Sequence, residues 1–152
     1  MSGVHCLYIF DRAGTCLYYR EWDRPCRPTG SQEDEQKMIF GLCFTLKTLA
    51  AAIDPTEGRK PLGSALKIGE GSAFRSFATN NYRTHFQEHP SGIKLILLTR
   101  TDWIDCQPLL RHIYEHAYVP YVVRNPLCQP GVPFQSEGFE SELETVIGAE
   151  TK

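Results

Sequence analysis

Two strand-like segments joined by a turn open the chain. Residues 4–10 are apolar on both alternating faces, a pattern typical of a strand that is covered on both sides. Gly14 lies in the turn that follows and can adopt the positive φ of a bulged hairpin loop. Residues 16–22 supply the return strand. The pattern therefore predicts a β-hairpin at this end of the sequence.

A long helix with two apolar stripes is predicted after the hairpin. Ser31 and Asp34 form a loose version of the capping box, and the acidic residues 33–35 favour the positive end of a helix dipole. Apolar side chains then recur at helical spacing in two adjacent stripes, one made of Met38, Leu42, Leu46, Leu49 and Ile53 and the other of Ile39, Phe40, Cys43 and Phe44. A surface helix usually buries only one stripe. We therefore expect this helix to pack on a sheet and on something more.

The stripe left over once the sheet is covered is a candidate partner-binding surface, because an exposed apolar patch usually marks an interface. We expect Ile39, Phe40 and Cys43 to contact a partner protein. The alternative is a cover from within the chain, made by the last helix or by residues 54–72. The latter hold two prolines and four glycines among polar residues and are predicted to form a long flexible loop.

The second half of the chain predicts three strands and two helices. The strand-like segments are residues 73–79, 82–86 and 93–98. The next helix has Pro108 in its first turn, where proline is tolerated, and Pro120 is expected to kink this helix or end it early. A last amphipathic helix is predicted to start near Ser136. Its apolar side consists of Phe139, Leu143 and Ile147.

A loop between these two helices is a second candidate surface. Pro126 fixes a rigid loop after the helix stop, and Asn125 can hydrogen-bond to nearby backbone, which is a structural role. Such a loop is also an exposed element that a partner protein could recognise. The candidate residues are Arg124, Asn125, Pro126 and Leu127.

Charge and composition exclude several classes of protein. The formal net charge is −2 and the basic residues are scattered, so neither nucleic acid nor an anionic membrane is an expected partner. No apolar run approaches the roughly 20 residues that span a bilayer, and the first residues do not resemble a signal peptide. We therefore expect a cytoplasmic protein without a transmembrane segment, whose six cysteines are reduced and structural.

One pattern of residues resembles a catalytic zinc motif. Residues 112–116 read His-Ile-Tyr-Glu-His, which places His112 and His116 one turn apart on a helix. A zinc site also needs a third protein ligand and a cleft, and the acidic residues further along fit a solvated helix face. We interpret the pair as surface histidines. No glycine-rich phosphate loop is present, and we predict no catalytic residue, no metal and no cofactor.

Sequence blocks along most of the chain, outside residues 54–72, resemble the small subunits of the TRAPP (transport protein particle) complex. The blocks are LYIFDRxG at residues 7–14, YxEW at 19–22, YRxHF at 82–86, PxGIK at 90–94, HIY at 112–114 and VRNPLC at 123–128. The resemblance implies an α+β, longin or profilin-like fold. Such a fold has a five-stranded antiparallel sheet and the order strand-strand-helix-strand-strand-strand-helix-helix, here in a single domain over residues 1–152.

The resemblance also implies a function. A small TRAPP subunit is non-catalytic by itself and belongs to a vesicle-tethering complex in transport from the endoplasmic reticulum to the Golgi. Several subunits together form a guanine-nucleotide exchange surface for a Rab-family GTPase. The implied partners are other TRAPP subunits and, through the assembled complex, that GTPase. The implied location is cytoplasmic, peripherally associated with Golgi and ER-derived membranes.

Another membrane-trafficking role stays open on the residues alone. The chain could be the regulatory or adaptor longin domain of a different trafficking complex. Longin domains of membrane-fusion proteins are followed by a long heptad segment, whereas here the last helical pattern stops near residue 147. We therefore favour the tethering subunit.

Overall fold

A computed structural model describes residues 3–24, 30–56 and 75–150. Most of the predicted loop at 54–72 lies outside the described residues, as does Cys26. The elements follow one another as strand, strand, helix, three strands and a helical C-terminal part, which is the predicted order.

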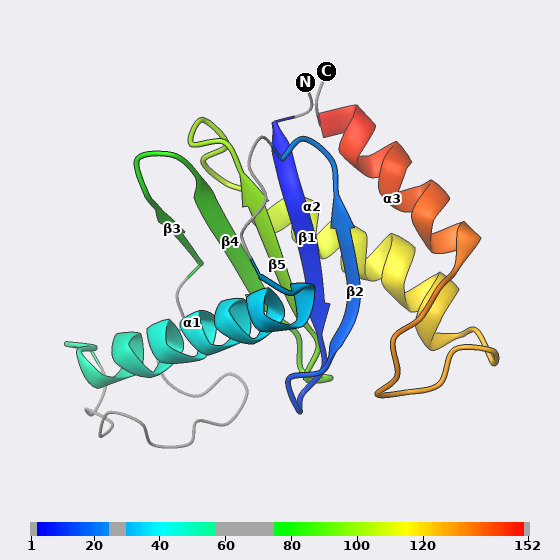
Figure 1. The fold of residues 1–152 in the computed structure, drawn as a ribbon, viewed down its shortest axis with the longest axis horizontal. Coiled ribbons are helices and arrows are strands. Elements are labelled where there is room, and N and C mark those ends of the chain that lie inside the picture. Colours follow the sequence, from blue (N-terminus) through cyan, green and yellow to red (C-terminus); the bar gives the residue numbers. More distant parts are fainter. Residues whose placement is uncertain (1–2, 25–29, 57–74, 151–152) are drawn as a thin grey trace.

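Five antiparallel strands form one sheet, in the spatial order β2-β1-β5-β4-β3 (Figure 1). The strands are β1 (Val4–Phe10), β2 (Cys16–Glu21), β3 (Ser76–Ala78), β4 (Arg83–Glu88) and β5 (Lys94–Thr99). The predicted fold class, α+β and consistent with a longin-like domain, is therefore confirmed. β1 lies between β2 and β5 and is covered on both faces, which is why its sequence is apolar at nearly every position.

The predicted hairpin joins β1 to β2. Gly14 adopts a φ of +91°, the left-handed region that favours glycine. The Asp11 N–H donates to the carbonyl oxygen of Thr15, and the register shifts after Ile9, so the turn carries a bulge as expected.

Helices cover the two faces of the sheet unequally. On one face lie α2 (Gln107–His112), η1 (Ile113–Val123) and α3 (Glu137–Glu150), which bury the larger hydrophobic core. On the other face lies only α1 (Gln32–Ala52) among the described residues (Figure 1). Alternate β1 residues belong to the two cores: Leu7 and Ile9 face α2, η1 and α3, and Tyr8 faces α1.

Of the two effects expected at Pro120, a kink or an early end of the helix, the structure contradicts the early end. The helical backbone continues through Pro120 to Val123 as η1, a π-helix. The Arg124 N–H donates to the carbonyl oxygen of Val119, five residues back, at 3.1 Å. A proline clashes with the carbonyl four residues before it in a regular α-helix, and the wider π turn relieves that clash.

The last helix agrees with its sequence pattern. Phe139, Leu143 and Ile147 are all buried against the larger core, as predicted. The Ser136 hydroxyl accepts a hydrogen bond from the Phe139 N–H and so caps the first turn. Within the part of the chain that the structure describes, no helix is both long and apolar enough to cross a membrane.

Candidate partner-binding surfaces

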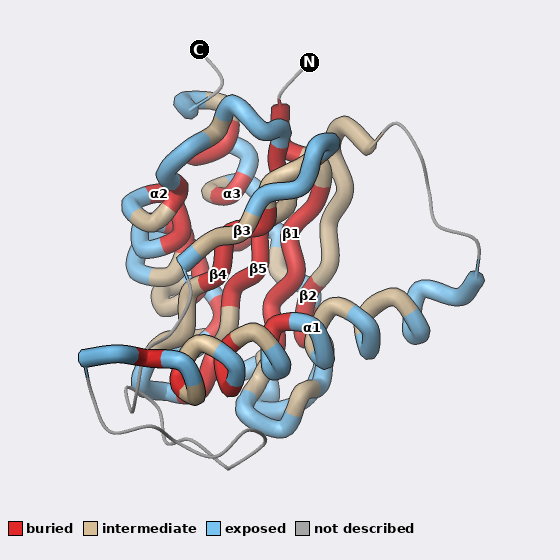
Figure 2. Tube along the Cα trace, turned by 90° about the vertical axis from the view of Figure 1, so that its left-hand side faces the viewer, coloured by how far each residue is buried: buried red, intermediate tan, exposed pale blue. Residues whose placement is uncertain are grey.

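α1 presents an apolar face to solvent. The helix lies across one end of the sheet and extends beyond it, with exposed stretches along its length (Figure 1, Figure 2). The Ser31 hydroxyl caps its first turn by accepting from the Asp34 N–H at 3.2 Å, as the sequence predicts. The exposed apolar side chains of α1 and its C-cap are Met38, Leu42, Phe44, Leu49 and Ile53. Met38 is 66% exposed and Ile53 is 67% exposed, values unusual for large apolar side chains clustered on one element.

Three residues of the second apolar stripe face the sheet, whereas the fourth, Phe44, is exposed. Cys43 is 3% exposed, and Ile39 and Phe40 are half-buried against the smaller core, which is built around Tyr8, Phe10 and other residues of the sheet. Ile39 also lines an open groove of about 510 Å³ between α1 and the β3–β4 turn. The prediction that these three residues contact a partner stays a prediction, and the side chains that α1 leaves outermost belong mainly to the other stripe.

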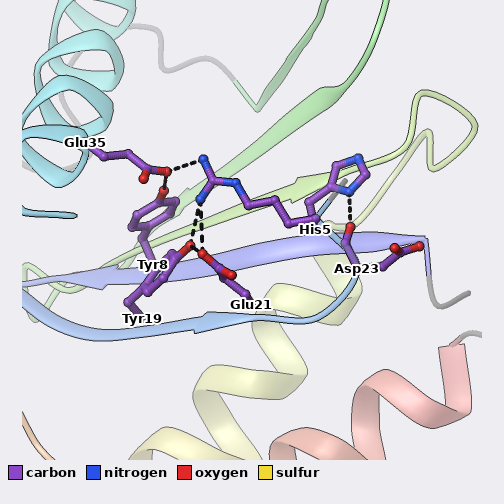
Figure 3. Close-up of polar contacts among 7 residues, drawn as sticks. His5, Tyr8, Tyr19, Glu21, Asp23 and Glu35 are labelled. Atoms are coloured by element: carbon purple, nitrogen blue, oxygen red, sulfur yellow. Dashed lines mark hydrogen bonds and ion pairs between the residues drawn. The ribbon is translucent and has the colours of Figure 1, made fainter. Parts of the chain in front are cut away.

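A cluster of polar side chains fastens the first turns of α1 to the hairpin (Figure 3). Arg24 is central: its Nη2 lies 2.6 Å from Glu35 Oε1, and its Nη1 donates to the Tyr19 hydroxyl at 2.7 Å. The Tyr8 hydroxyl donates to Glu35, and the Tyr19 hydroxyl donates to Glu21. Glu35 is the residue that α1 contributes to this group. Its contacts with Tyr8 and Arg24 hold the first turns of the helix against the sheet.

Burial keeps the Tyr8 hydroxyl of this cluster protonated. Burial, the neighbouring Cys6 thiol and the hydrogen bond to Glu35 all raise the pKa of the Tyr8 hydroxyl well above its ordinary value. Tyr8 therefore remains a hydrogen-bond donor at neutral pH, and Glu35 is the acceptor that pairs with Arg24. This arrangement holds α1 in place.

The second predicted surface is the loop after η1. Leu127 is 89% exposed, and Arg124 and Pro126 are also exposed. Asn125 is half-buried, and its Oδ1 accepts from the Leu127 N–H at 3.0 Å, so the predicted local hydrogen bond is present. The Asn125 carbonyl oxygen accepts from the Cys128 N–H as well. These bonds make the loop a rigid support for an outward leucine.

The two predicted surfaces do not join. α1 lies on one face of the sheet, and residues 124–127 follow η1, which lies on the opposite face (Figure 1). A single small ligand could not contact both.

The zinc-like motif at residues 112–116 lies where α2 continues into η1. The rings of His112 and His116 stack with their centroids 4.3 Å apart, and both residues are exposed. Among residues 3–24, 30–56 and 75–150, no group of three or more histidine, cysteine, aspartate or glutamate side chains could hold a metal ion. The histidine pair is thus a surface feature in the described structure.

The described cysteines are free thiols, and four of them lie in unreactive surroundings. Burial raises the pKa of the Cys6, Cys43 and Cys106 thiols to about 12 and that of Cys16 to about 11. These four side chains remain protonated at neutral pH and are poor nucleophiles. They pack as small apolar groups, as expected from the sequence.

Comparison with known proteins identifies the family of this chain. The sequence model of the Sybindin-like family matches residues 4–150. The chain belongs to the Sybindin-like family. It is 37% identical over 144 residues to the Rattus norvegicus protein named trafficking protein particle complex subunit 1, a match that covers 95% of this chain and 91% of the relative.

More distant relatives carry related names. A Dictyostelium discoideum protein, also named trafficking protein particle complex subunit 1, is 29% identical over 95% of this chain and 94% of its own length. The Saccharomyces cerevisiae protein named trafficking protein particle complex subunit BET5 is 28% identical over 93% of this chain and 82% of its own length. The likeness extends over nearly the whole of this Sybindin-like chain.

Sequence patterns alone missed part of the candidate surface on this Sybindin-like chain. Met38, Leu42 and Leu49 were recognised as one stripe of the helix, but helical spacing does not show which of two stripes faces the sheet. The sheet residues of the smaller core pack against Ile39, Phe40 and Cys43. Only the packed structure shows these contacts.

Proposed function

We propose that this chain is a non-catalytic core subunit of a TRAPP vesicle-tethering complex in transport from the endoplasmic reticulum to the Golgi. It contributes to a composite guanine-nucleotide exchange surface for a Rab-family GTPase. The observation that carries the proposal is 37% identity over 95% of the chain to a protein named trafficking protein particle complex subunit 1. The proposed location is the cytoplasm, peripheral to Golgi and ER-derived membranes.

The surfaces of the molecule support a role in assembly. A large exposed apolar face on one helix is costly to leave in water and usually marks a protein interface. Partner contacts are proposed at both surfaces, at Ile39, Phe40 and Cys43 beside the exposed stripe and at Arg124, Asn125, Pro126 and Leu127. The described residues hold no metal cluster, and their buried thiols are not activated, so nothing in them favours catalysis by this chain alone.

The native size of the protein tests the proposed function. Size-exclusion chromatography of cytosol should place the chain in a particle many times its own 17.3 kDa, with nucleotide-exchange activity on a Rab-family GTPase in the same fractions. Elution as a monomer or small homodimer would contradict the proposal. It would favour a solitary adaptor longin domain instead.

A charge on the exposed stripe of α1 should impair assembly. Met38→Glu is expected to weaken incorporation into the complex by tenfold or more, because a carboxylate would be desolvated at an apolar interface. Met38 is 66% exposed, so the fold should tolerate the change. Competition between tagged variant and wild-type chains for the purified complex measures the effect.

The control for this experiment is Ile104→Glu. Ile104 is 73% exposed and lies outside α1, between β5 and α2. It should compete as the wild-type chain does. Equal incorporation of the Met38 variant would show that this stripe is not an interface.

A further inference from the structure

A basic groove lies beside α1, on the side away from the β3–β4 turn. It has a volume of about 660 Å³, opens at the surface, and runs between α1 and the turns that end β1 and β4. Its apolar floor includes Phe40, Phe86 and Cys43. Phe44, which is 51% exposed, stands at its lip. The charged side chains that line it are Arg12, Lys47, Glu88 and Lys94.

The groove carries more positive than negative charge. Lys47 Nζ lies 2.6 Å from Glu88 Oε1, and Lys94 Nζ lies 3.4 Å from Glu88 Oε2, so two ammonium groups share one carboxylate. Lys47 is only 9% exposed. Charges that are partly removed from water attract an opposite charge more strongly than charges at the surface do. A second carboxylate at this place would balance the pair.

Arg12 adds a third cation at the mouth of the groove. Its side chain lies across Gly92, where an added Cβ would stand 2.8 Å from Arg12 Nε and 2.9 Å from Arg12 Cβ. The missing side chain of Gly92 thus lets the arginine pack against the turn. No carboxylate of the described residues forms an ion pair with Arg12. The groove therefore offers anchored cations around an apolar floor.

We infer that this groove receives a segment of a partner subunit that inserts an apolar side chain flanked by acidic residues. The inference rests on the proposed function. The apolar anchor would occupy the space between Phe40 and Phe44, and the carboxylates would pair with Arg12, Lys47 and Lys94. Because Lys47 and Lys94 are already held by ion pairs with Glu88, fewer side chains have to become ordered when the partner binds.

Charge argues against an occupant from the same chain. Residues 57–74 follow α1 in sequence, and they contain Arg59, Lys60 and Lys67 but only Glu57 and Glu70. A segment with more basic than acidic residues does not complement a groove of excess positive charge. An acidic partner does.

Photo-crosslinking identifies the occupant. We would place p-benzoylphenylalanine at position 44 and irradiate the complex purified from cells. The expected product joins position 44 to a segment of another subunit in which an apolar residue is flanked by aspartate or glutamate. Crosslinking to residues 57–74 of the same chain, to a segment without acidic residues, or to no subunit would overturn the inference.

Charge reversal tests the electrostatic part. The double variant Arg12→Glu, Lys94→Glu should weaken binding to the purified remainder of the complex by tenfold or more, and lysine at the crosslinked acidic positions of the partner should restore it. Arg111→Glu, an exposed reversal on α2, should bind within twofold of wild type. Since Lys94 also contacts Glu88, Arg12→Glu alone is measured too, and it should weaken binding at least threefold while keeping the melting temperature.

The two proposals fail in different ways. If the chain is absent from any large particle, the proposed function fails. If the chain is a complex subunit but the Arg12 variants bind like the Arg111 variant, only the inference about the groove fails.

Discussion

Phe139→Ala should lower the free energy of unfolding by about 4 kcal/mol, the size found when a fully buried phenylalanine is truncated. Phe139 is completely buried where α3 meets the sheet. Its ring contacts Tyr18 edge-on, with centroids 4.9 Å apart, and Phe134 edge-on at 5.2 Å. The truncation would remove these contacts and leave a cavity between the elements that form the larger core. Urea unfolding of the isolated chain measures the loss.

The matched control is Leu127→Ala. Leu127 is 89% exposed, so its truncation should change the unfolding free energy by no more than about 0.5 kcal/mol. The same control reports on the loop as a partner surface, since it should weaken assembly without weakening the fold. A small effect of Phe139→Ala would mean that α3 does not pack on the sheet as described.

Between about pH 7.5 and about pH 5, the free energy of unfolding of His85→Gln should fall by about 2 kcal/mol less than that of the wild-type protein. His85 is 1% exposed, and burial first, then the nearby positive charge of Arg83, lowers its pKa from 6.5 to about 4. Its Nε2 donates to the Thr99 hydroxyl at 2.9 Å, because that hydroxyl itself donates to the Arg100 carbonyl oxygen. The fold therefore holds a neutral imidazole.

The sign of the effect follows from the two pKa values. Between pH 6.5 and pH 4 the unfolded chain takes up a proton at His85 that the folded chain does not, so unfolding becomes easier as the pH falls. Above pH 6.5 both states are neutral and the contribution of His85 is fully present. A glutamine keeps an N–H donor and has no proton to gain in this range.

Unfolding free energies at the two pH values measure the effect for wild type, His85→Gln and His112→Gln. His112→Gln is the matched control, because His112 is exposed whereas His85 is buried. Burial also lowers the pKa of His89, whose ring stacks on Tyr114, and this residue should keep part of the dependence in the His85 variant. Equal pH dependence in all three proteins would show that His85 is not held neutral.

The sequence located both candidate surfaces, but it did not show which side of α1 faces the sheet. The stripes of α1 and the rigid loop at Asn125 were both visible as patterns. Helical spacing places Met38 and Ile39 on neighbouring faces and does not say which one meets the sheet. The basic groove was missed because Lys47 and Glu88 are 41 positions apart and neither stands out in its own segment.

The sequence by itself determined the elements and their order. A strand repeats every two residues and a helix every 3.6, so the hairpin at β1 and β2, the cap at Ser31 and the buried side of α3 can be predicted from neighbouring residues. The tertiary structure decided the rest. It set which side chains of α1 remain exposed, allowed the helix to pass Pro120, and brought Lys47 and Lys94 to Glu88 in a groove that Arg12 also lines. These features depend on contacts between distant segments, and local periodicity carries no information about such contacts.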